Sequence, residues 1–217
     1  MFGEIANIPT DGIKPKLLFY MSGITLWNYF SACLTATSNT FVANAGIFGK
    51  VYFPRLVIPL STVMSNRVKF GIQFSLLLAV MAWYGVKNQQ FHFGTSWLLI
   101  PVLVLMMAGL GLGLGIIISS LTTKYRDFNV LIGFAVQLLM YATPVAYPLS
   151  FLKDKYYAAW IAWNPLTPII ESFRYALFGT GTVDATGLLL SGGFIVLMLF
   201  IGMLIFSKVE RTFMDTV

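Results

Sequence analysis

Five long stretches without a charged residue constrain this chain more than any other feature of its sequence. They cover residues 17–49, 70–86, 93–123, 128–151 and 185–207. A helix that crosses a lipid bilayer needs about 20 mostly apolar residues, so each stretch can hold one crossing, the second only just. Barrel strands would instead alternate in hydrophobicity over about 10 residues. The sequence therefore predicts an all-α integral membrane protein.

The composition agrees with this prediction. Of the 217 residues, 58% are hydrophobic and 10% charged, whereas soluble proteins carry roughly 25% charged residues. The net charge of +6 belongs to loops that flank a bilayer, so we expect no nucleic-acid partner. The single cysteine, Cys33, excludes a disulfide framework and a thiolate metal site, and we expect no metal ligands. We predict one transmembrane domain over residues 1–217, with helices near 17–40, 70–86, 97–121, 128–149 and 188–206.

The basic residues predict the orientation of this bundle. One side of the membrane receives residues 45–69, 122–127 and 208–217, with 8 Lys and Arg in 41 residues. The other side receives residues 1–16, 87–94 and 150–184, with 6 in 59. Because cytoplasmic loops carry the excess of Lys and Arg, the C-terminus is predicted inside and the N-terminus outside.

The chain lacks the groups that drive transport directly. No ionisable residue falls inside a predicted span, and ion-coupled carriers usually keep such groups there. The sequence also lacks the Gly-x-x-x-x-Gly-Lys-Ser/Thr phosphate-binding motif. Energy for uphill transport would therefore come from another polypeptide, which would hold the ATP and Mg²⁺; no cofactor is expected on this chain.

Two helix faces are candidates for a substrate path. On the first span, one face carries the polar residues Asn28, Ser31, Thr35, Ser38 and Asn39. On the fourth span, Phe134, Gln137 and Tyr141 share a face, and an aromatic ring beside an amide is a common way to hold a sugar. Hydrogen bonding between helices and core packing are the respective alternatives.

The third span contains two pairs of glycines on opposite faces. Gly109 and Gly113 form one pair, and Gly111 and Gly115 the other. Such pairs allow helix backbones to approach closely in lipid. We therefore expect this helix to be packed tightly between two others.

Two segments outside the predicted spans have unusual compositions. Residues 150–184 place Tyr156, Trp160 and Trp163 on one helical face, which is typical of an interfacial or re-entrant element; this element is either a membrane anchor or an external gate. Residues 44–56 are too polar to span the bilayer and too apolar for a free linker. They would dock to a cytosolic partner or lie flat on the membrane.

An ordered series of short motifs resembles the permease subunits of type-2 ABC exporters, above all those that export polysaccharide, O-antigen or teichoic acid. The motifs are Lys50-Val51-Tyr52-Phe53-Pro54-Arg55 with Ile58-Pro59-Leu60, the glycine-rich third span before Tyr125-Arg126-Asp127, Thr143-Pro144-Val145 with Tyr147-Pro148, Asn164-Pro165, residues 171–175, and Val209-Glu210-Arg211-Thr212-Phe213. No single motif is diagnostic, but the ordered set covers nearly the whole chain.

The resemblance implies six transmembrane helices, an N-terminal interface helix and a re-entrant external element before the last helix. It also implies that two permeases pair with two ATP-hydrolysing subunits. The first span here would match the family's second, so the interface helix and first helix would be absent. The residues that touch the ATPase would be Asn44, Ile47, Phe48, Lys50, Tyr52, Phe53 and Arg55.

The sequence thus predicts a transport permease, not an enzyme, that moves a polysaccharide or lipid-linked glycan across the bacterial inner membrane as a homodimer with a separate ATPase. A permease for drugs or small lipids is the nearest alternative. A membrane-embedded sugar or acyl transferase is the alternative from another class. Its candidate groups, which form no recognisable motif, are His92, Asp127, Asp154 and Glu171.

Overall fold

The computed structural model describes residues 10–13, 15–48, 56–88, 94–124, 128–152, 158–181 and 183–214. These residues form helices and contain no strand, which confirms the predicted all-α class. The long helices are α2 (Lys16–Ser38), α4 (Val57–Asn88), α5 (Leu99–Lys124) and α9 (Ala185–Met214). The shorter ones are α3 (Thr40–Phe48), η1 (Thr95–Leu98), α6 (Phe128–Tyr141), η2 (Leu149–Leu152), α7 (Ala158–Ala162) and α8 (Leu166–Phe178).

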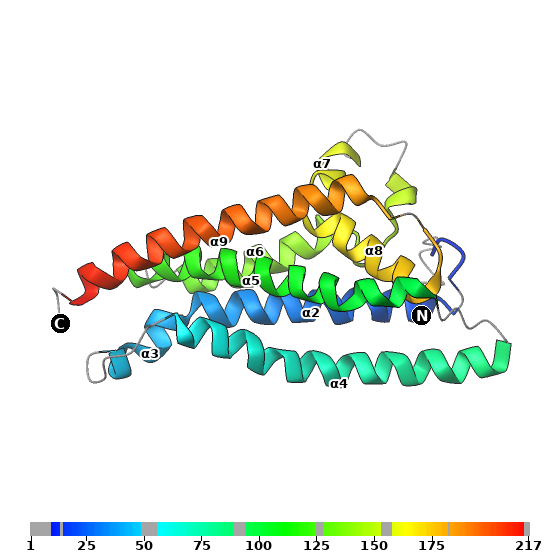
Figure 1. Cartoon of the computed structure of the whole chain (residues 1–217), viewed down its shortest axis with the longest axis horizontal. Helices are drawn as coiled ribbons and strands as arrows, with labels where there is room; N and C mark the ends of the chain where they lie inside the picture. Colours follow the sequence, from blue (N-terminus) through cyan, green and yellow to red (C-terminus); the bar gives the residue numbers. More distant parts are fainter. Residues whose placement is uncertain are drawn as a thin grey trace.

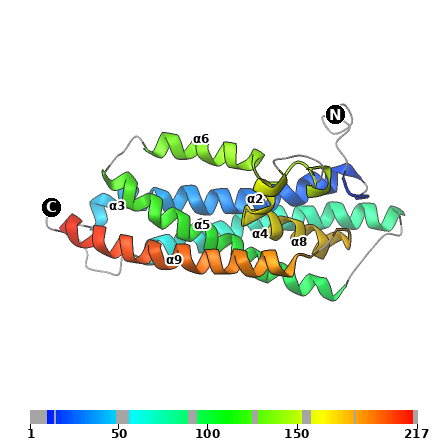
Figure 2. The ribbon, with the colours of Figure 1, turned by 90° about the horizontal axis from the view of Figure 1, so that it is seen from above.

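The long helices lie side by side along one axis (Figure 1), with α5 packed against both α2 and α9, and α2 packed against both α5 and α4. Helix α6 runs beside α2 on the side away from α9 (Figure 2). Helices α7 and α8 and the first turns of α9 gather at one end of the bundle, here called the α8 end. Helix α3 and the last turns of α9 lie at the opposite end, here called the α3 end.

The glycines of α5 explain why this helix lies at the centre. A Cβ on Gly111 or Gly115 would meet α2, 2.9 Å from Cys33 Cβ and 2.6 Å from Thr37 Cβ respectively. On the opposite face, a Cβ on Gly109 or Gly113 would meet α9, 2.9 Å from Ile195 Cγ2 and 3.1 Å from the Leu199 backbone nitrogen. The close packing of both faces, predicted from the spacing of these glycines, is therefore confirmed.

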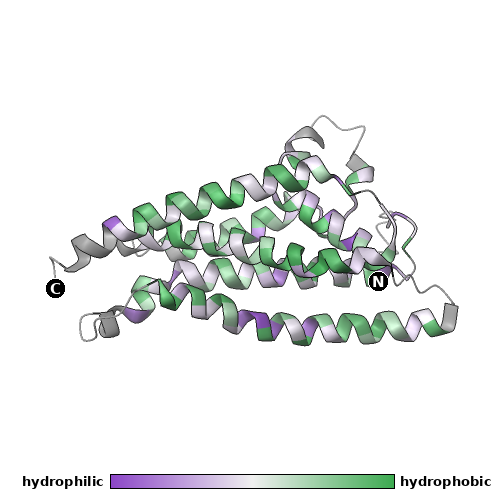
Figure 3. Ribbon diagram, in the orientation of Figure 1, coloured by the Kyte–Doolittle hydropathy of each residue, from purple (hydrophilic) through white to green (hydrophobic). Residues whose placement is uncertain are grey.

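Four helices of the described part are long and apolar enough to cross a bilayer, namely Lys16–Ser38, Val57–Val86, Thr95–Thr122 and Ala185–Lys208. Figure 3 shows that α5 and α9 are almost wholly hydrophobic, whereas α4 carries a hydrophilic patch partway along the helix. The fifth predicted span is shorter than expected, because α6 ends at Tyr141 and not near residue 149. Pro144 explains the difference, since proline disfavours helical geometry at the residue before it and cannot donate a helical hydrogen bond.

Helix α4 also departs from the prediction, because it begins at Val57 and not at Phe70. Pro59 stands in the first turn, where its missing N–H is harmless. Arg67 and Lys69, assigned to a loop by their charge, therefore lie on this helix with exposed side chains, so a candidate span does contain ionisable residues. At 1.5 Å per residue the 30 residues of this span measure about 45 Å, longer than a bilayer core of about 30 Å.

Helix α8 is part of the core and does not lie on the surface of the bundle. Its apolar residues, spaced as on one helical face, are fully buried: Leu166, Ile169, Ile170, Phe173, Ala176 and Leu177. It contacts α2, α5 and α9. This apolar face therefore packs within the bundle, and the two alternatives for residues 150–184, a membrane anchor or an external gate, stay predictions.

Candidate functional site

The predicted coupling segment is described only in part. Asn44 lies on α3 and is half-buried, and its side-chain nitrogen donates a hydrogen bond to the Thr40 carbonyl at 2.9 Å. Ile47 and Phe48 complete the same helix, but their side chains lie outside the described residues. Four further predicted residues, Lys50, Tyr52, Phe53 and Arg55, lie outside them entirely.

Helix α3 is tied firmly to the transmembrane bundle. The Phe41 ring is buried and stacks on Phe206 of α9, with 4.6 Å between ring centroids. The Phe41 backbone N–H donates to Ser119 Oγ of α5 at 3.4 Å. A displacement of α3 would therefore be passed on to α5 and α9, the two helices that α3 contacts through this ring and this hydrogen bond.

The polar face of α2, predicted to line a substrate path, is partly exposed. Asn28 and Thr35 are exposed and Ser31 is half-buried. The Asn28 side chain donates to Oε1 of Gln73 on α4 at 3.5 Å. Gln73 is a member that the sequence analysis missed, because nothing in its own helix marks it. Ser38 does not belong to this face, since it is buried and donates to the Thr35 carbonyl.

The predicted face of α6 is exposed, so the core-packing alternative is wrong within this chain. Phe134 is 62% exposed and Tyr141 is 76% exposed, and Gln137 is exposed as well. The helix buries Ile132 and Val136 instead.

The predicted aromatic gate is also only partly described. Trp160 on α7 is 82% exposed, Trp163 just beyond it is 88% exposed, and Tyr156 lies outside the described residues. Trp163 lines a cavity of about 570 Å³ between α7, α8 and α9, which Asn164 and Ser191 also line. Exposed tryptophans at one end of an apolar bundle are typical of the bilayer interface.

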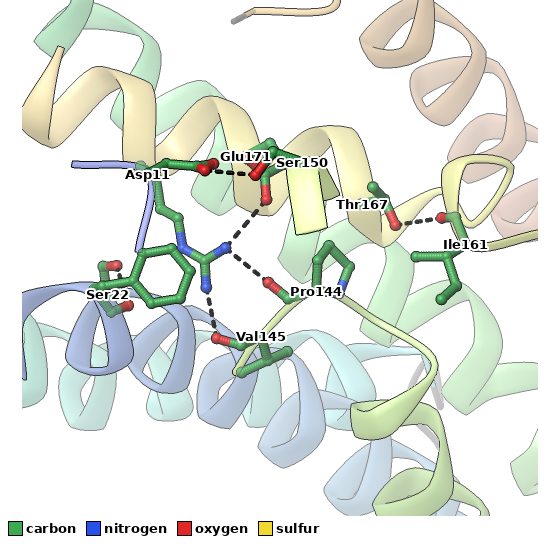
Figure 4. Close-up of polar contacts among 10 residues, drawn as sticks. Asp11, Ser22, Pro144, Val145, Ser150, Ile161, Thr167 and Glu171 are labelled. Atoms are coloured by element: carbon green, nitrogen blue, oxygen red, sulfur yellow. Dashed lines mark hydrogen bonds and ion pairs between the residues drawn. The ribbon is translucent and has the colours of Figure 1, made fainter. Parts of the chain in front are cut away.

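The most highly connected polar residue of the described structure, Arg174 of α8, was not predicted to be functional. It is buried, and its guanidinium donates to the Pro144 carbonyl at 2.8 Å, to the Val145 carbonyl at 2.5 Å and to the Glu171 carboxylate at 3.1 Å (Figure 4). The guanidinium carbon also lies 3.7 Å from the centre of the Phe19 ring. These contacts supply the partners that a buried cation needs.

Burial shifts the pKa values of both Glu171 and Arg174. Burial raises the pKa of Glu171 above its ordinary value, and the Arg174 charge opposes that rise. Burial lowers the pKa of Arg174 to about 10, against the effect of Glu171, so the guanidinium remains protonated at neutral pH. The sequence offered one indication of this pair, because residues spaced i, i+3 are neighbours on a helix. The sequence analysis did not use it, because it assigned residues 150–184 to an external element.

An acidic cavity of about 370 Å³ adjoins this pair. It is lined by the carboxylates of Asp11, Glu171 and Asp184, with Ser150 and Thr167 beside them. The Ser150 hydroxyl donates to the Asp11 carboxylate, which draws the segment before α2 onto η2 (Figure 4). Within the described residues, no three His, Cys, Asp or Glu side chains are grouped as a metal site would require.

The long apolar helices packed around the central α5 define a multi-pass membrane protein. Comparison with known proteins places it more closely. Residues 2–178 match the ABC-2 type transporter family, and the chain belongs to that family.

Three related proteins are similar over most of the chain. Two are O-antigen export system permease proteins RfbA of Klebsiella pneumoniae, 32% identical over 202 residues and 29% identical over 200 residues; each alignment covers 91% of this chain and 74% of the relative. The third is the O-antigen export system permease protein RfbA of Myxococcus xanthus, 26% identical over 205 residues, or 94% of this chain and 77% of the relative.

Proposed function

We propose that this protein is the transmembrane subunit of an ATP-driven exporter that moves a polysaccharide or lipid-linked glycan across the bacterial inner membrane. The observation that carries the proposal is the similarity to three O-antigen export permeases over at least 91% of the chain. The chain would act as a homodimer. A separate ATPase would bind ATP and Mg²⁺, because this sequence has no phosphate-binding motif of its own.

The ATPase would act at the α3 end of the bundle, which we assign to the cytoplasm. The density of Lys and Arg in residues 45–69, 122–127 and 208–217 supports this orientation. Residues 44–55 would contact the ATPase, and the Phe41–Phe206 stack would carry their displacement to the transmembrane helices.

The glycan would pass along the exposed faces of α2, α4 and α6. Asn28, Gln73 and Thr35 supply hydrogen-bonding groups, and Phe134 and Tyr141 supply rings on which a sugar can stack. The described residues of α2, α4, α5 and α6 include no Asp or Glu. A phosphate-bearing carrier lipid would therefore meet no repelling carboxylate on these helices.

The test is co-purification of the protein from membranes with candidate cytosolic ATPases, followed by measurement of ATP hydrolysis with and without this subunit. We expect one ATPase to remain bound through purification and its hydrolysis rate to change. The absence of a complex with any candidate would contradict the proposal.

A further inference from the structure

Three motifs that lie far apart in the sequence meet at one point of the structure. Residues 143–145 form the turn that follows α6, Asn164 precedes α8, and Arg174 lies within α8. The side chains of Asn164 and Arg174 both bond to this turn. We call these two side chains the α6 clamp.

The clamp supplies donors to the carbonyls just beyond the end of α6. The last carbonyls of α6 itself have other partners, since Thr143 Oγ1 donates to the Leu139 carbonyl and the Tyr147 hydroxyl to the Tyr141 carbonyl, each at 2.7 Å. The Asn164 side-chain nitrogen donates to the Ala142 carbonyl at 3.1 Å and to Thr143 Oγ1 at 3.0 Å. Arg174 donates to the carbonyls of Pro144 and Val145, and its positive charge is favourable beside the C-terminal end of α6.

The clamp is fixed to a rigid part of the molecule. Thr143 and Val145 are fully buried. The Val145 carbonyl also approaches α2 so closely that a Cβ on Gly23 would lie 2.5 Å from its oxygen. Helix α8, which carries Arg174, is itself buried among α2, α5 and α9. The turn after α6 therefore cannot move without these helices.

The remainder of α6 is held far less firmly. Ile132 and Val136 are its buried side chains among the described residues, each at 6% to 8% exposure. Leu139 and Met140, in its last turn, are partly buried, whereas Val130, Leu131 and Leu138 are exposed. The turn after α6 is thus fixed by four side-chain hydrogen bonds, whereas the earlier turns of α6 contribute only Ile132 and Val136 to the described core.

We infer that Asn164 and Arg174 are positioning residues that hold the α8 end of α6 as a fixed pivot. The rest of α6 tilts about this pivot during the transport cycle and so sets the width of the path along α2. This inference rests on the proposed export function, since it assigns a moving element to that path. The pivot role accounts for a buried arginine that binds a turn outside the long spans.

Two cysteine pairs would measure this movement in the complete complex with its ATPase. Thr35 on α2 and Val130 on α6 each lie about 17 Å along their helices from the clamp, and both are exposed. Ile24 and Leu138 are exposed positions nearer to the clamp. After substitution by cysteine, each pair is treated with bifunctional thiol reagents, with and without trapped nucleotide. Gel mass separates cross-links within one chain from those between chains.

With the clamp intact, the cross-linking yield of only one cysteine pair should depend on nucleotide. We expect the yield of the Thr35–Val130 cross-link within a chain to change with nucleotide while the Ile24–Leu138 yield stays constant. Constant yields at both pairs in a complex that still exports would overturn the pivot and leave the proposed function intact. Failure to form the complex would refute the proposed function instead, so the two failures are distinguishable.

Asn164→Asp is the sharpest variant. The carboxylate keeps an oxygen for the Leu166 backbone N–H, which Asn164 Oδ1 now accepts at 3.0 Å, but it loses both donations to the α6 turn. Ser191→Ala is the matched control, because it removes a hydrogen bond to the nearby Pro165 carbonyl and leaves the clamp intact. If Asn164→Asp fails to fold, Arg174→Met with Glu171→Gln removes the other half of the clamp without leaving a buried unpaired charge.

In the clamp variant the Ile24–Leu138 yield should become nucleotide-dependent. Export should fall by about fivefold or more, the lower range of coupling between protein sites, while ATP hydrolysis continues. Ser191→Ala should match the wild type in all three measurements. A clamp variant that exports normally with an unchanged Ile24–Leu138 yield would overturn the inference.

Discussion

Gly23 lies against Arg174 at the α8 end, and the position of the Arg174 side chain requires a glycine there. A Cβ on Gly23 would lie 2.8 Å from an Arg174 terminal nitrogen as well as 2.5 Å from the Val145 oxygen. The absence of a side chain on α2 is therefore what allows a guanidinium and a turn carbonyl to meet against that helix. The requirement is one of space, not of backbone conformation.

Gly23→Ala should therefore destabilise the protein by about 1 to 3 kcal/mol, the usual effect of overpacking a well-packed site. Gly71→Ala is the control, because a Cβ there meets nothing within 4 Å and alanine favours a helix by about 0.5 to 1 kcal/mol over glycine. Thermal unfolding of the purified variants distinguishes them. Equal midpoints for the two variants would contradict the close approach at Gly23.

Glu171 should make stability depend on pH. Because burial raises its pKa in the folded protein above the ordinary value of 4.5, the folded state favours the protonated form. The stabilisation it contributes is complete below pH 4.5 and is lost as pH rises through the folded pKa. The unfolding midpoint of the wild type, measured relative to Glu171→Gln, should therefore decline as pH rises from 4.5. A difference that grows over this range would show the opposite shift.

At the scale of the helices, α5 is the element on which the others are assembled. Its glycines leave both faces flat, so α2 and α9 approach to within backbone contact distance. Helix α4 then packs mainly against α2, whereas α6 contacts α2 and α5 only lightly. Displacement of α2 from α5 would therefore disturb the polar face of α2 and both of its neighbours.

Gly115→Ala tests this packing, since the added Cβ would lie 2.6 Å from Thr37 Cβ. We expect a loss of about 1 to 3 kcal/mol in the free energy of unfolding. Gly133→Ala on α6, where a Cβ meets nothing within 4 Å, should not lower stability. Chemical or thermal unfolding in detergent measures both, and a Gly115→Ala protein as stable as Gly133→Ala would argue against a tightly packed α2–α5 contact.

Substitutions on the exposed face of α6 should affect export and not stability. Replacing Phe134 and Tyr141 together by alanine removes two exposed rings, so folding should change by less than about 0.5 kcal/mol per site. If these rings hold the glycan, surface polysaccharide should decrease while the amount of folded protein in the membrane is unchanged. Wild-type export by the double variant would remove α6 from the path.

At the scale of the whole molecule, the two ends of the bundle differ in charge. The described carboxylates near the α8 end line one cavity, whereas the basic segments are concentrated toward the α3 end. This asymmetry supports a cytoplasmic α3 end, which is the end at which we propose that the ATPase binds. Lys50 and Arg55 are the two cations of the proposed coupling segment, residues 44–55.

Replacing Lys50 and Arg55 by glutamate should weaken association with the ATPase, because both charges of the proposed contact are reversed. Retention of the ATPase during affinity purification measures the effect, and higher salt should weaken the wild-type complex if these charges contribute. A control reversal of Lys87, at the other end of α4, should leave retention unchanged. Undiminished co-purification of the Lys50 and Arg55 variant would remove this segment from the interface.

Much of this architecture was predictable, because hydropathy and helical periodicity are local properties. Four of the five uncharged stretches became helices long enough to span a bilayer, and the glycine spacing identified both packed faces of α5. Arg67 and Lys69 misplaced the start of α4, since charge alone does not separate a loop from a helix that extends beyond the bilayer.

The clamp could not be predicted, because its parts are distant in sequence. Arg174 reaches carbonyls about thirty residues away, and nothing local to either segment shows that they meet. The assignment of residues 150–184 to an external element concealed the buried face of α8 for the same reason. The clamp and the burial of α8 both depend on packing between elements that are distant in sequence.

The central claim, export of a glycan driven by a partner ATPase, is tested most directly in inside-out membrane vesicles that hold the complex and a labelled lipid-linked polysaccharide. The measurement is the fraction of glycan protected from an added glycosidase, with and without ATP. We predict that protection rises with ATP and is abolished when the ATPase is inactivated. Equal protection under all conditions, in vesicles where the complex is intact, would contradict the account.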